Sequence, residues 1–380
     1  MTSPAVVAEE PPRRYEVADV LRGHAHGLRL TAVQARAVRD IVACRTERLG
    51  GHLEVCKDCG FSRGSYNSCR NRHCPKCQIL KQELWAEAQE ALLLPTVYFQ
   101  IVFTIPSELH PFFRRAPGVC LNLLFEAVSE TLTQISRTNL KATIGFTAVL
   151  HTWNQQLGFH PHLHCVIPAG GLSFDESRWV STSRRFFLPV KKLRKKFRGK
   201  LFFKIEHALR AGEILGDLTN DLSLLQRTPK TWNVFAKAPL VEAGHVVHYL
   251  SRYVHRIAIA NSRITHYDGQ SVTFRYKDRA DGNKTKERVV SGPDFAKLFL
   301  QHVLPPRFVR IRHYGILAAR KREDLALCRK LIGAPSAPKR EKDANWVAAF
   351  ERLLGYNPLQ CPACKTGVLV MTRVLPPRRA

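Results

Sequence analysis

The chain has 380 residues, of which 45% are hydrophobic and 24% are charged, a composition typical of a folded globular protein and not of a disordered one. Lysine and arginine total 59 against 31 aspartates and glutamates, which gives a formal net charge of +28. An excess of this size favours a polyanionic partner, here nucleic acid. No apolar run approaches the roughly 18 residues of a membrane span, and residues 1–14 do not resemble a cleavable signal. We therefore expect a cytoplasmic, nucleoid-associated bacterial protein with reduced cysteines and no membrane partner.

The predicted elements, taken in chain order, indicate a mixed α+β protein. The first is a helix over 31–46, where Thr31 and Gln34 form a capping box and apolar residues recur on one face. A cysteine-rich loop over 52–77 follows. The later elements are a helix at 78–94, strands at 97–105, 143–151, 162–168 and 231–238, helices at 119–137 and 241–258, a hairpin at 271–277 and 285–290, and helices at 293–304 and 318–332.

Two pairs of cysteines in and beside the loop have the spacing of a structural zinc site. Cys56 and Cys59 form one CxxC knuckle, and Cys74 and Cys77 form another. Four thiolates complete a closed tetrahedral site that leaves no position open for a substrate. We therefore expect these four cysteines to bind one structural Zn²⁺, whose loss would unfold this region.

Other potential ligands leave alternatives open. A second ion could be held in the same stretch by Cys44, His52, Cys69 and His73, which could equally be buried small or polar side chains. Cys361 and Cys364 form a further knuckle without an evident closing pair, although Cys328 could contribute a ligand. This late knuckle is either completed by folding back of the chain or vestigial.

Histidines alternate with other residues at the start of one predicted strand. His162 and His164 would point to the same face of that strand, with Cβ atoms about 7 Å apart, so both imidazoles can hold one divalent ion. A neighbouring strand should supply the third ligand. We favour His151, at the end of the preceding strand, over His160, which Pro161 separates from the regular strand. The expected ion is Mg²⁺ or Mn²⁺, and Mn²⁺ is the better acceptor of nitrogen ligands.

A pair of tyrosines lies on the predicted helix at 241–258. Tyr249 and Tyr253 are four residues apart, so both phenols lie on one face, about 6 Å apart along the axis. Aromatic residues at this spacing are common in protein cores, but the neighbouring Arg252 and Arg256 suit a helix that faces phosphate. A metal site facing two tyrosines has the groups needed to cut single-stranded DNA through a phosphotyrosine bond.

A basic, phenylalanine-rich stretch over 186–203 is a candidate for binding single strands by stacking and charge. Its alternative is a solvated charged surface above core phenylalanines. The basic residues that we single out are Lys191, Lys192, Lys195 and Lys196.

Several motifs, in order, resemble those of one family. HPHLHCV is similar to the His-hydrophobic-His (HUH) motif of single-strand endonucleases, YLSRYVHR to their two-tyrosine motif, and YFQIVFTIP to their first motif. CKDCG…YNSCRNRHCPKCQ, VLHTWNQQLGFHPHLHCV, FAKAP and RIRHYG resemble transposases of the insertion-sequence ninety-one family. The similarity runs from about residue 30 to 365. The late knuckle departs from the pattern, because Lys365 replaces the glycine that often follows its second cysteine.

The resemblance implies an N-terminal zinc domain, an HUH nuclease domain with a central antiparallel sheet, and rolling-circle transposition. It makes Tyr249 and Tyr253 the nucleophiles, and His162 and His164 metal ligands. The domains that we expect are a flexible tail at 1–25, a small helical zinc-binding domain at 26–94, a nuclease domain at 95–304 with a basic insertion at about 172–230, and a basic C-terminal region at 305–380.

The expected reaction is nicking and joining of single-stranded transposon ends and target through a 5′-phosphotyrosine. It needs no ATP, and no GxxxxGK[ST] loop is present. The nearest rival functions are a replication initiator or a relaxase with the same nuclease. A more distant rival is a non-catalytic zinc protein that binds DNA.

Overall fold

The computed structural model describes residues 15–77, 79–90, 92–182, 188–237, 258–336, 343 and 345–378. Its centre is a five-stranded antiparallel sheet with the strand order β13-β5-β6-β3-β9. These strands are β3 (Tyr98–Thr104), β5 (Gly145–Trp153), β6 (Phe159–Pro168), β9 (Asn233–Ala236) and β13 (Ile311–Gly315). The fold is therefore of the α+β class that the sequence predicts.

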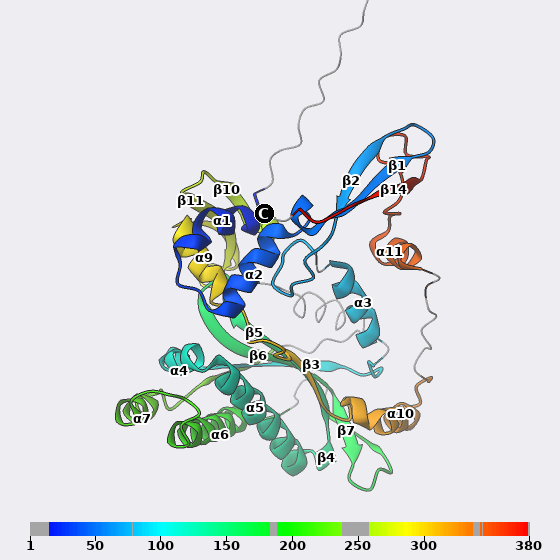
Figure 1. The fold of residues 1–380 in the computed structure, drawn as a ribbon. Coiled ribbons are helices and arrows are strands. Elements are labelled where there is room, and N and C mark those ends of the chain that lie inside the picture. The colour runs from blue at the N-terminus through cyan, green and yellow to red at the C-terminus, as the bar shows by residue number, and fades with distance from the viewer. Residues whose placement is uncertain are drawn as a thin grey trace, which may run out of the picture.

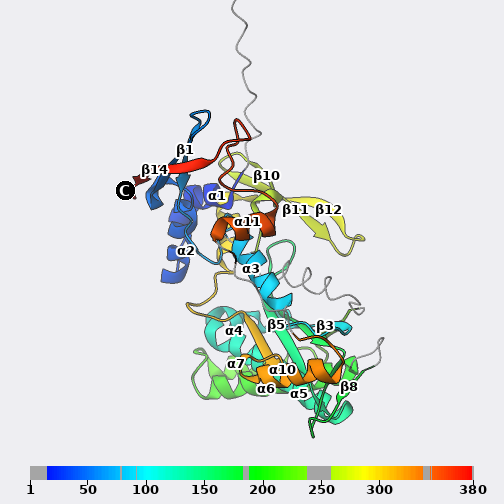
Figure 2. The same cartoon turned by 90° about the vertical axis from the view of Figure 1, so that its right-hand side faces the viewer.

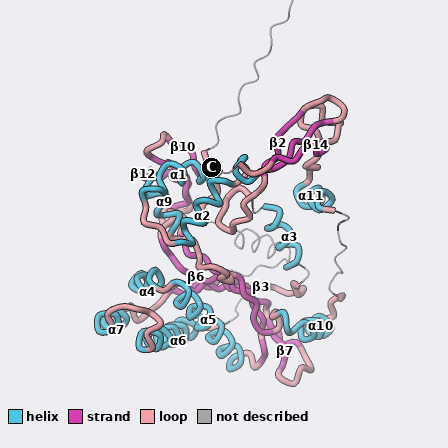
Figure 3. Tube along the Cα trace, viewed as in Figure 1, coloured by secondary structure: helices cyan, strands magenta, loops and turns pink. Residues whose placement is uncertain are grey.

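Helices cover one face of this sheet, as Figures 1 and 3 show. They are α4 (His110–Arg115), α5 (Pro117–Asn139), α6 (Val190–Arg210) and α7 (Leu218–Gln226). Because side chains alternate along a strand, every second residue of β5 and β6 enters the core beneath these helices, including Leu150, Leu163 and Cys165. The intervening residues point to the opposite face, which α3 (Ile79–Glu90) partly covers.

Helix α6 lies within the basic insertion predicted at about 172–230 and packs against the main sheet. Its residues Leu193, Phe197, Leu201 and Ile205 are fully buried and recur every four positions, so they form one apolar stripe against the sheet and α5. The high density of lysine and arginine obscures this stripe in the sequence. The segment is therefore part of the main core. A small sheet of β4 (Ala142–Thr143), β7 (Gly170–Ser173) and β8 (Trp179–Ser181) precedes it.

A second core lies above the main sheet in Figures 1 and 2, where the N-terminal helices meet residues that come much later in the chain. Helices α1 (Val17–His24) and α2 (Ala32–Ala43) pack with α9 (Gly292–Leu300) over a sheet of three strands. The strands are β10 (Ile264–Tyr267), β11 (Ser271–Asp278) and β12 (Lys284–Ser291). The predicted capping box is confirmed, since the Thr31 side chain accepts from the backbone N–H of Gln34.

Helix α1 also corrects the predicted flexible tail at 1–25. Glu16 and Asp19 cap the start of the helix reciprocally. Val17, Val20 and Leu21 are almost completely buried against α9 and β11. The N-terminal helices therefore complete their core with residues that come more than 200 positions later.

The remaining elements connect the C-terminal region to earlier parts of the chain. Strands β1 (Gly51–Cys56), β2 (Ser62–Tyr66) and β14 (Leu369–Leu375) form a sheet in the order β14-β1-β2. Helix α10 (Arg322–Leu331) packs near β7, and α11 (Trp346–Leu354) lies beside α3. Short 3-10 turns occupy Ala25–Gly27, Glu47–Leu49, Ser107–Leu109, Asn261–Arg263 and Ala319–Lys321.

These contacts also correct the predicted boundary at residue 304. Strand β13 lies beyond that boundary, yet it pairs with β5 as an edge of the main sheet, with His313 opposite Thr147. The segment 305–380 is therefore divided between the main sheet and the β1-β2-β14 sheet. Across the described residues, no helix combines the length and apolarity required to traverse a lipid bilayer.

The buried position of α1 predicts a cost for truncating its side chains. Leu21→Ala should lower the free energy of unfolding by about 2–5 kcal/mol, because it leaves a cavity between α1 and α9. Arg22→Ala on the exposed face, where Arg22 pairs with Asp19, should change it by less than about 0.5–1 kcal/mol. Urea denaturation of both variants checks this, and equal midpoints would contradict the shared core.

Candidate functional site

Three histidines converge on the face of the main sheet opposite to α4–α7. His151 on β5 stands directly opposite His162 on β6, and His164 follows two residues later on the same face. The ring centroids of His151 and His164 are 4.7 Å apart, and those of His162 and His164 are 4.8 Å apart. One nitrogen from each of the three lies within 4.8 Å of the others. The arrangement can hold one divalent ion with three imidazole ligands.

Hydrogen bonds orient two of the three rings. Nδ1 of His162 donates to the backbone carbonyl of His160 at 2.6 Å, which leaves its Nε2 lone pair available for a metal. Nδ1 of His164 lies 2.7 Å from the side-chain amide of Gln100, a fully buried residue on β3. The atom of Gln100 at this contact is Nε2, so a metal on Nε2 of His164, which requires the proton on Nδ1, would also require the Gln100 amide to rotate by 180° so that its oxygen accepts that proton. The indole of Trp153 stacks on His151 at 4.7 Å.

Burial keeps the imidazoles of His162 and His164 neutral. Burial lowers the pKa of His162 to about 3. Burial also holds the pKa of His164 well below its usual value, and the positive charges of His151, His162, Lys237 and Arg279 lower it further. A neutral imidazole is the form that binds a metal ion. The influence of Lys237 and Arg279 on the pKa of His164 also shows that these two basic side chains lie near the histidines.

His160 does not join this group. Its ring centroid lies 5.1 Å from that of His162, but its nitrogen atoms do not converge with those of the other three histidines. Its backbone carbonyl instead orients His162. The preference for His151 over His160 therefore agrees with the geometry.

Both tyrosines of the sequence motif, Tyr249 and Tyr253, lie outside the described residues, together with Arg252 and Arg256. The residues that border this segment are described. The backbone N–H of Lys237 donates to the carbonyl of Gln100 at 2.9 Å. Ala258 lines a small pocket with Trp153 and His302. Lys237 therefore contacts Gln100, which contacts His164, and Ala258 shares a pocket with Trp153, which stacks on His151.

The lysines of the basic stretch lie away from the histidines. Lys191, Lys192, Lys195 and Lys196 are exposed along α6, which packs on the other face of the main sheet. Of the phenylalanines in this stretch, Phe197 is buried in the core and Phe203 is exposed. Nothing in the described contacts connects these lysines to the histidine face.

The cysteines divide differently from the prediction. Cys74 and Cys77 converge with Cys44 and Cys69, whereas Cys56 and Cys59 converge with Cys361 and Cys364. The single site expected from Cys56, Cys59, Cys74 and Cys77 is therefore wrong. Strand β1 ends at Cys56 and pairs with β14, so the knuckle of Cys56 and Cys59 lies near the C-terminal cysteines and not near Cys74 and Cys77.

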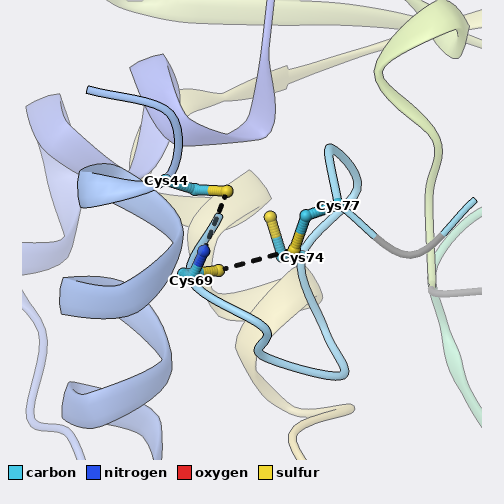
Figure 4. Close-up of side chains that lie close together, drawn as sticks. All are labelled: Cys44, Cys69, Cys74 and Cys77. Atoms are coloured by element: carbon cyan, nitrogen blue, oxygen red, sulfur yellow. Dashed lines mark hydrogen bonds between the residues drawn. The ribbon is translucent and has the colours of Figure 1, made fainter. Parts of the chain in front are cut away.

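The first group has the geometry of a closed zinc site (Figure 4). Cys44 caps the C-terminal end of α2, and its sulfur is turned toward those of the other three cysteines, which lie on the loop after β2. The sulfurs of Cys69 and Cys77 are 3.8 Å apart, which matches the edge of about 3.8 Å of a tetrahedron with Zn–S bonds of about 2.3 Å. Contacts with Cys69 lower the pKa of Cys44 to about 7. The residues therefore fit a structural zinc ion.

The two histidines considered for a second ion have other roles. His52 contacts the carboxylate of Glu54 at 2.9 Å, and Arg63 donates to the same carboxylate. Nε2 of His73 accepts from the backbone N–H of Leu304. Neither histidine belongs to a cysteine group within the described residues.

Sequence reasoning missed two residues near the histidines. A glutamine in the middle of an apolar strand was a signal for Gln100, because a buried amide needs a partner. Arg279, in the turn between β11 and β12, carried no signal, since its proximity to the histidines depends on how the second core packs.

Comparisons with known proteins identify a zinc-binding part and a transposase part of the chain. Residues 17–105 match the family model described as "Transposase zinc-binding domain", and residues 145–324 match the one described as "Putative transposase". The chain is 41% identical to "Putative transposase y4qJ" of Sinorhizobium fredii, over 96% of this chain and 97% of that protein. The chain belongs to the IS91 family of transposases.

A more distant relative supports the same assignment. The transposase is 26% identical to "Transposase for insertion sequence element IS801" of Pseudomonas savastanoi pv. phaseolicola, over 77% of this chain and 72% of that protein. No solved structure matches the chain. A transposase cleaves and joins DNA, so DNA is its partner, and the alternative of a non-catalytic zinc protein is excluded.

The contact between Gln100 and His164 predicts an effect on metal affinity. Gln100→Leu should weaken Mn²⁺ binding about 10- to 100-fold, because His164 loses the partner that orients it. Gln100→Glu supplies a carboxylate oxygen that can accept the Nδ1 proton of His164, and this variant should retain most of the affinity. Titration of Mn²⁺ followed by electron paramagnetic resonance measures both, and equal affinity of the two variants would contradict the orienting role.

Proposed function

We propose that this transposase nicks and joins single-stranded DNA through a 5′-phosphotyrosine, as a two-tyrosine HUH enzyme of the rolling-circle type. The observation that supports this most is the convergence of His151, His162 and His164 on one sheet face. A divalent ion held there, Mg²⁺ or Mn²⁺, would polarise the scissile phosphate and offset the charge on the leaving oxygen.

Tyr249 and Tyr253 are the proposed nucleophiles. The phenol oxygen of one tyrosine attacks the phosphorus, and the bond from phosphorus to the 3′ oxygen breaks as the new bond forms. The leaving oxygen takes up a proton as the phenol loses one, which yields a free 3′-OH. The covalent bond conserves the energy of the phosphodiester, so a 3′-OH can later reverse the step and join strands.

The contacts at both borders of 238–257 support this assignment. The backbone of Lys237 is hydrogen-bonded to that of Gln100, whose side chain contacts His164. Ala258 shares a pocket with Trp153, which stacks on His151. The described residues that flank the tyrosine segment, Lys237 and Ala258, therefore lie near the histidines. Two tyrosines would allow one molecule to cut a second strand while it is still bonded to the first.

Basic side chains around the histidines are the proposed contacts for DNA phosphates. Lys237 and Arg279 both act on the pKa of His164 by charge, and Arg279 is exposed in the hairpin turn. Arg252 and Arg256 are further candidates, from the two-tyrosine motif. Lys191, Lys192, Lys195 and Lys196 would contact DNA only where it extends past the edge strand β9 to α6.

Replacing the tyrosines tests the mechanism. Tyr249→Phe and Tyr253→Phe, together, should abolish the covalent adduct with a labelled single-stranded transposon end, because no phenol oxygen remains to attack. Single variants should still nick but should fail to complete strand exchange. A denaturing gel measures the adduct, and zinc content serves as the control for folding. An adduct of full intensity in the double variant would refute the assignment.

Replacing Arg279 tests the proposed path of the DNA. Arg279→Ala should weaken binding of single strands by a few-fold at low salt and reduce the salt dependence by about one phosphate contact. Arg320→Ala is the matched control, because Arg320 is exposed in the 3-10 turn Ala319–Lys321, which precedes α10. Fluorescence anisotropy at several salt concentrations measures both. Equal slopes for the two variants would contradict this path.

A further inference from the structure

We propose that Cys56, Cys59, Cys361 and Cys364 bind a second structural zinc ion, which fastens residues 361–375 to strand β1. The matched zinc-binding family model ends at residue 105, so it does not include the last two ligands. All four thiols lie within 4.8 Å of one another. The site would be distinct from the Cys44 group and from the histidines.

The sulfur geometry fits zinc and excludes disulfides. Sγ of Cys56 lies 3.8 Å from Sγ of Cys364, and Sγ of Cys59 lies 3.7 Å from Sγ of Cys361. A disulfide requires about 2.05 Å, whereas a tetrahedral ion with Zn–S bonds of about 2.3 Å separates its sulfurs by about 3.8 Å. Both short contacts cross from one knuckle to the other, so a single ion would join the two.

The two knuckles have matching backbone turns. The N–H of Gly60 donates to the carbonyl of Cys56 at 3.1 Å, and the N–H of Lys365 donates to that of Cys361 at 3.1 Å. Gly60 has a φ of 73° and Lys365 has a φ of 64°. Lys365 therefore adopts the left-handed conformation that glycine would favour. The turn is preserved despite the missing glycine, at a cost of about 1–2 kcal/mol that only a stabilising interaction would offset.

Neighbouring backbone groups favour a thiolate in the second knuckle. The N–H of Gly367 donates to Sγ of Cys364 at 3.2 Å. A hydrogen bond from a backbone N–H to sulfur stabilises a thiolate, which is the form that binds zinc. A Cβ at position 367 would collide with Sγ of Cys56. The backbone after Cys364 therefore packs directly on the knuckle of Cys56 and Cys59.

The β14-β1-β2 sheet has too little apolar core to be stable by itself. Its buried cluster consists of Cys56, Cys361 and Leu369, with Phe61 and Cys364 partly buried. Met371 and Val374 on β14 are largely exposed. Three strands without a substantial apolar face are marginal in water, and small modules of this kind are stabilised by a structural metal.

Zinc content tests the proposal in the full chain. Cys361→Ser with Cys364→Ser should lose one zinc equivalent relative to the unmodified protein, as should Cys69→Ser with Cys77→Ser. Cys328→Ala is the matched control, because Cys328 is buried in the C-terminal region but belongs to neither group. Mass spectrometry of the metal measures the content. An unchanged zinc content in the Cys361 and Cys364 variant would overturn the proposal.

A measurement without substitutions covers the case in which the variant does not fold. Cys59 is exposed, so solvent access alone would let it react with iodoacetamide. In the zinc-loaded protein, alkylation of Cys59 should be at least about tenfold slower than after addition of a chelator, because a zinc-bound thiolate is less nucleophilic. Peptide mass spectrometry gives both rates. Equal rates before and after chelation would show that no ion is bound there.

Discussion

The pairing of β5 with β6 is the interaction on which the candidate active site depends. Since side chains alternate along a strand, a register shift of one residue would send His151 to the helical face while His162 and His164 stayed where they are. A turn fixes this register, because the side-chain oxygen of Asn154 accepts the backbone N–H groups of Gln156 and Gly158. Arg288 on β12 also donates to the carbonyl of Gln156 at 2.8 Å. The second core therefore stabilises the turn that sets the histidines.

The two faces of the main sheet have separate tasks. One face is filled by apolar residues beneath α4–α7 and supplies most of the buried surface. The other carries the three histidines and Gln100, so the polar groups of the site rest on strands that are already fixed from below. A site on such strands needs little reorganisation when a metal or a phosphate binds.

Local patterns in the sequence were sufficient for the strands β3, β5, β6 and β9 of the main sheet, whereas the edge strand β13 was not predicted. The alternation around His162 and His164 predicts their common face, and the short return from the preceding strand predicts His151 beside them. The helix at α2, with Thr31 at its start, and the β11–β12 hairpin also follow from local signals. These features depend on residues that are close in sequence, so short-range rules describe them well.

Long-range packing accounts for what sequence reasoning missed. Cys56 and Cys59 could be assigned to Cys74 and Cys77 on spacing alone, because nothing local indicates that β14 pairs with β1. Helix α1 is apolar on one face for a partner, α9, that comes much later. The apolar stripe of α6 was present in the sequence at Leu193, Phe197 and Leu201. The lysines between these residues instead favoured the prediction of a basic, DNA-binding insertion.

The position of β1 in the middle of its sheet has a consequence during protein synthesis. Residues 51–66 leave the ribosome early, but the strand that covers the other edge of β1 is translated some 300 residues afterwards. Until then β1 presents an unpaired edge, which promotes association with other chains, and the thiols of Cys56 and Cys59 lack the two cysteines that complete their group. Nascent copies that stop short of residue 361 would keep this edge open, and chaperones or proteases could distinguish them from chains that have closed it.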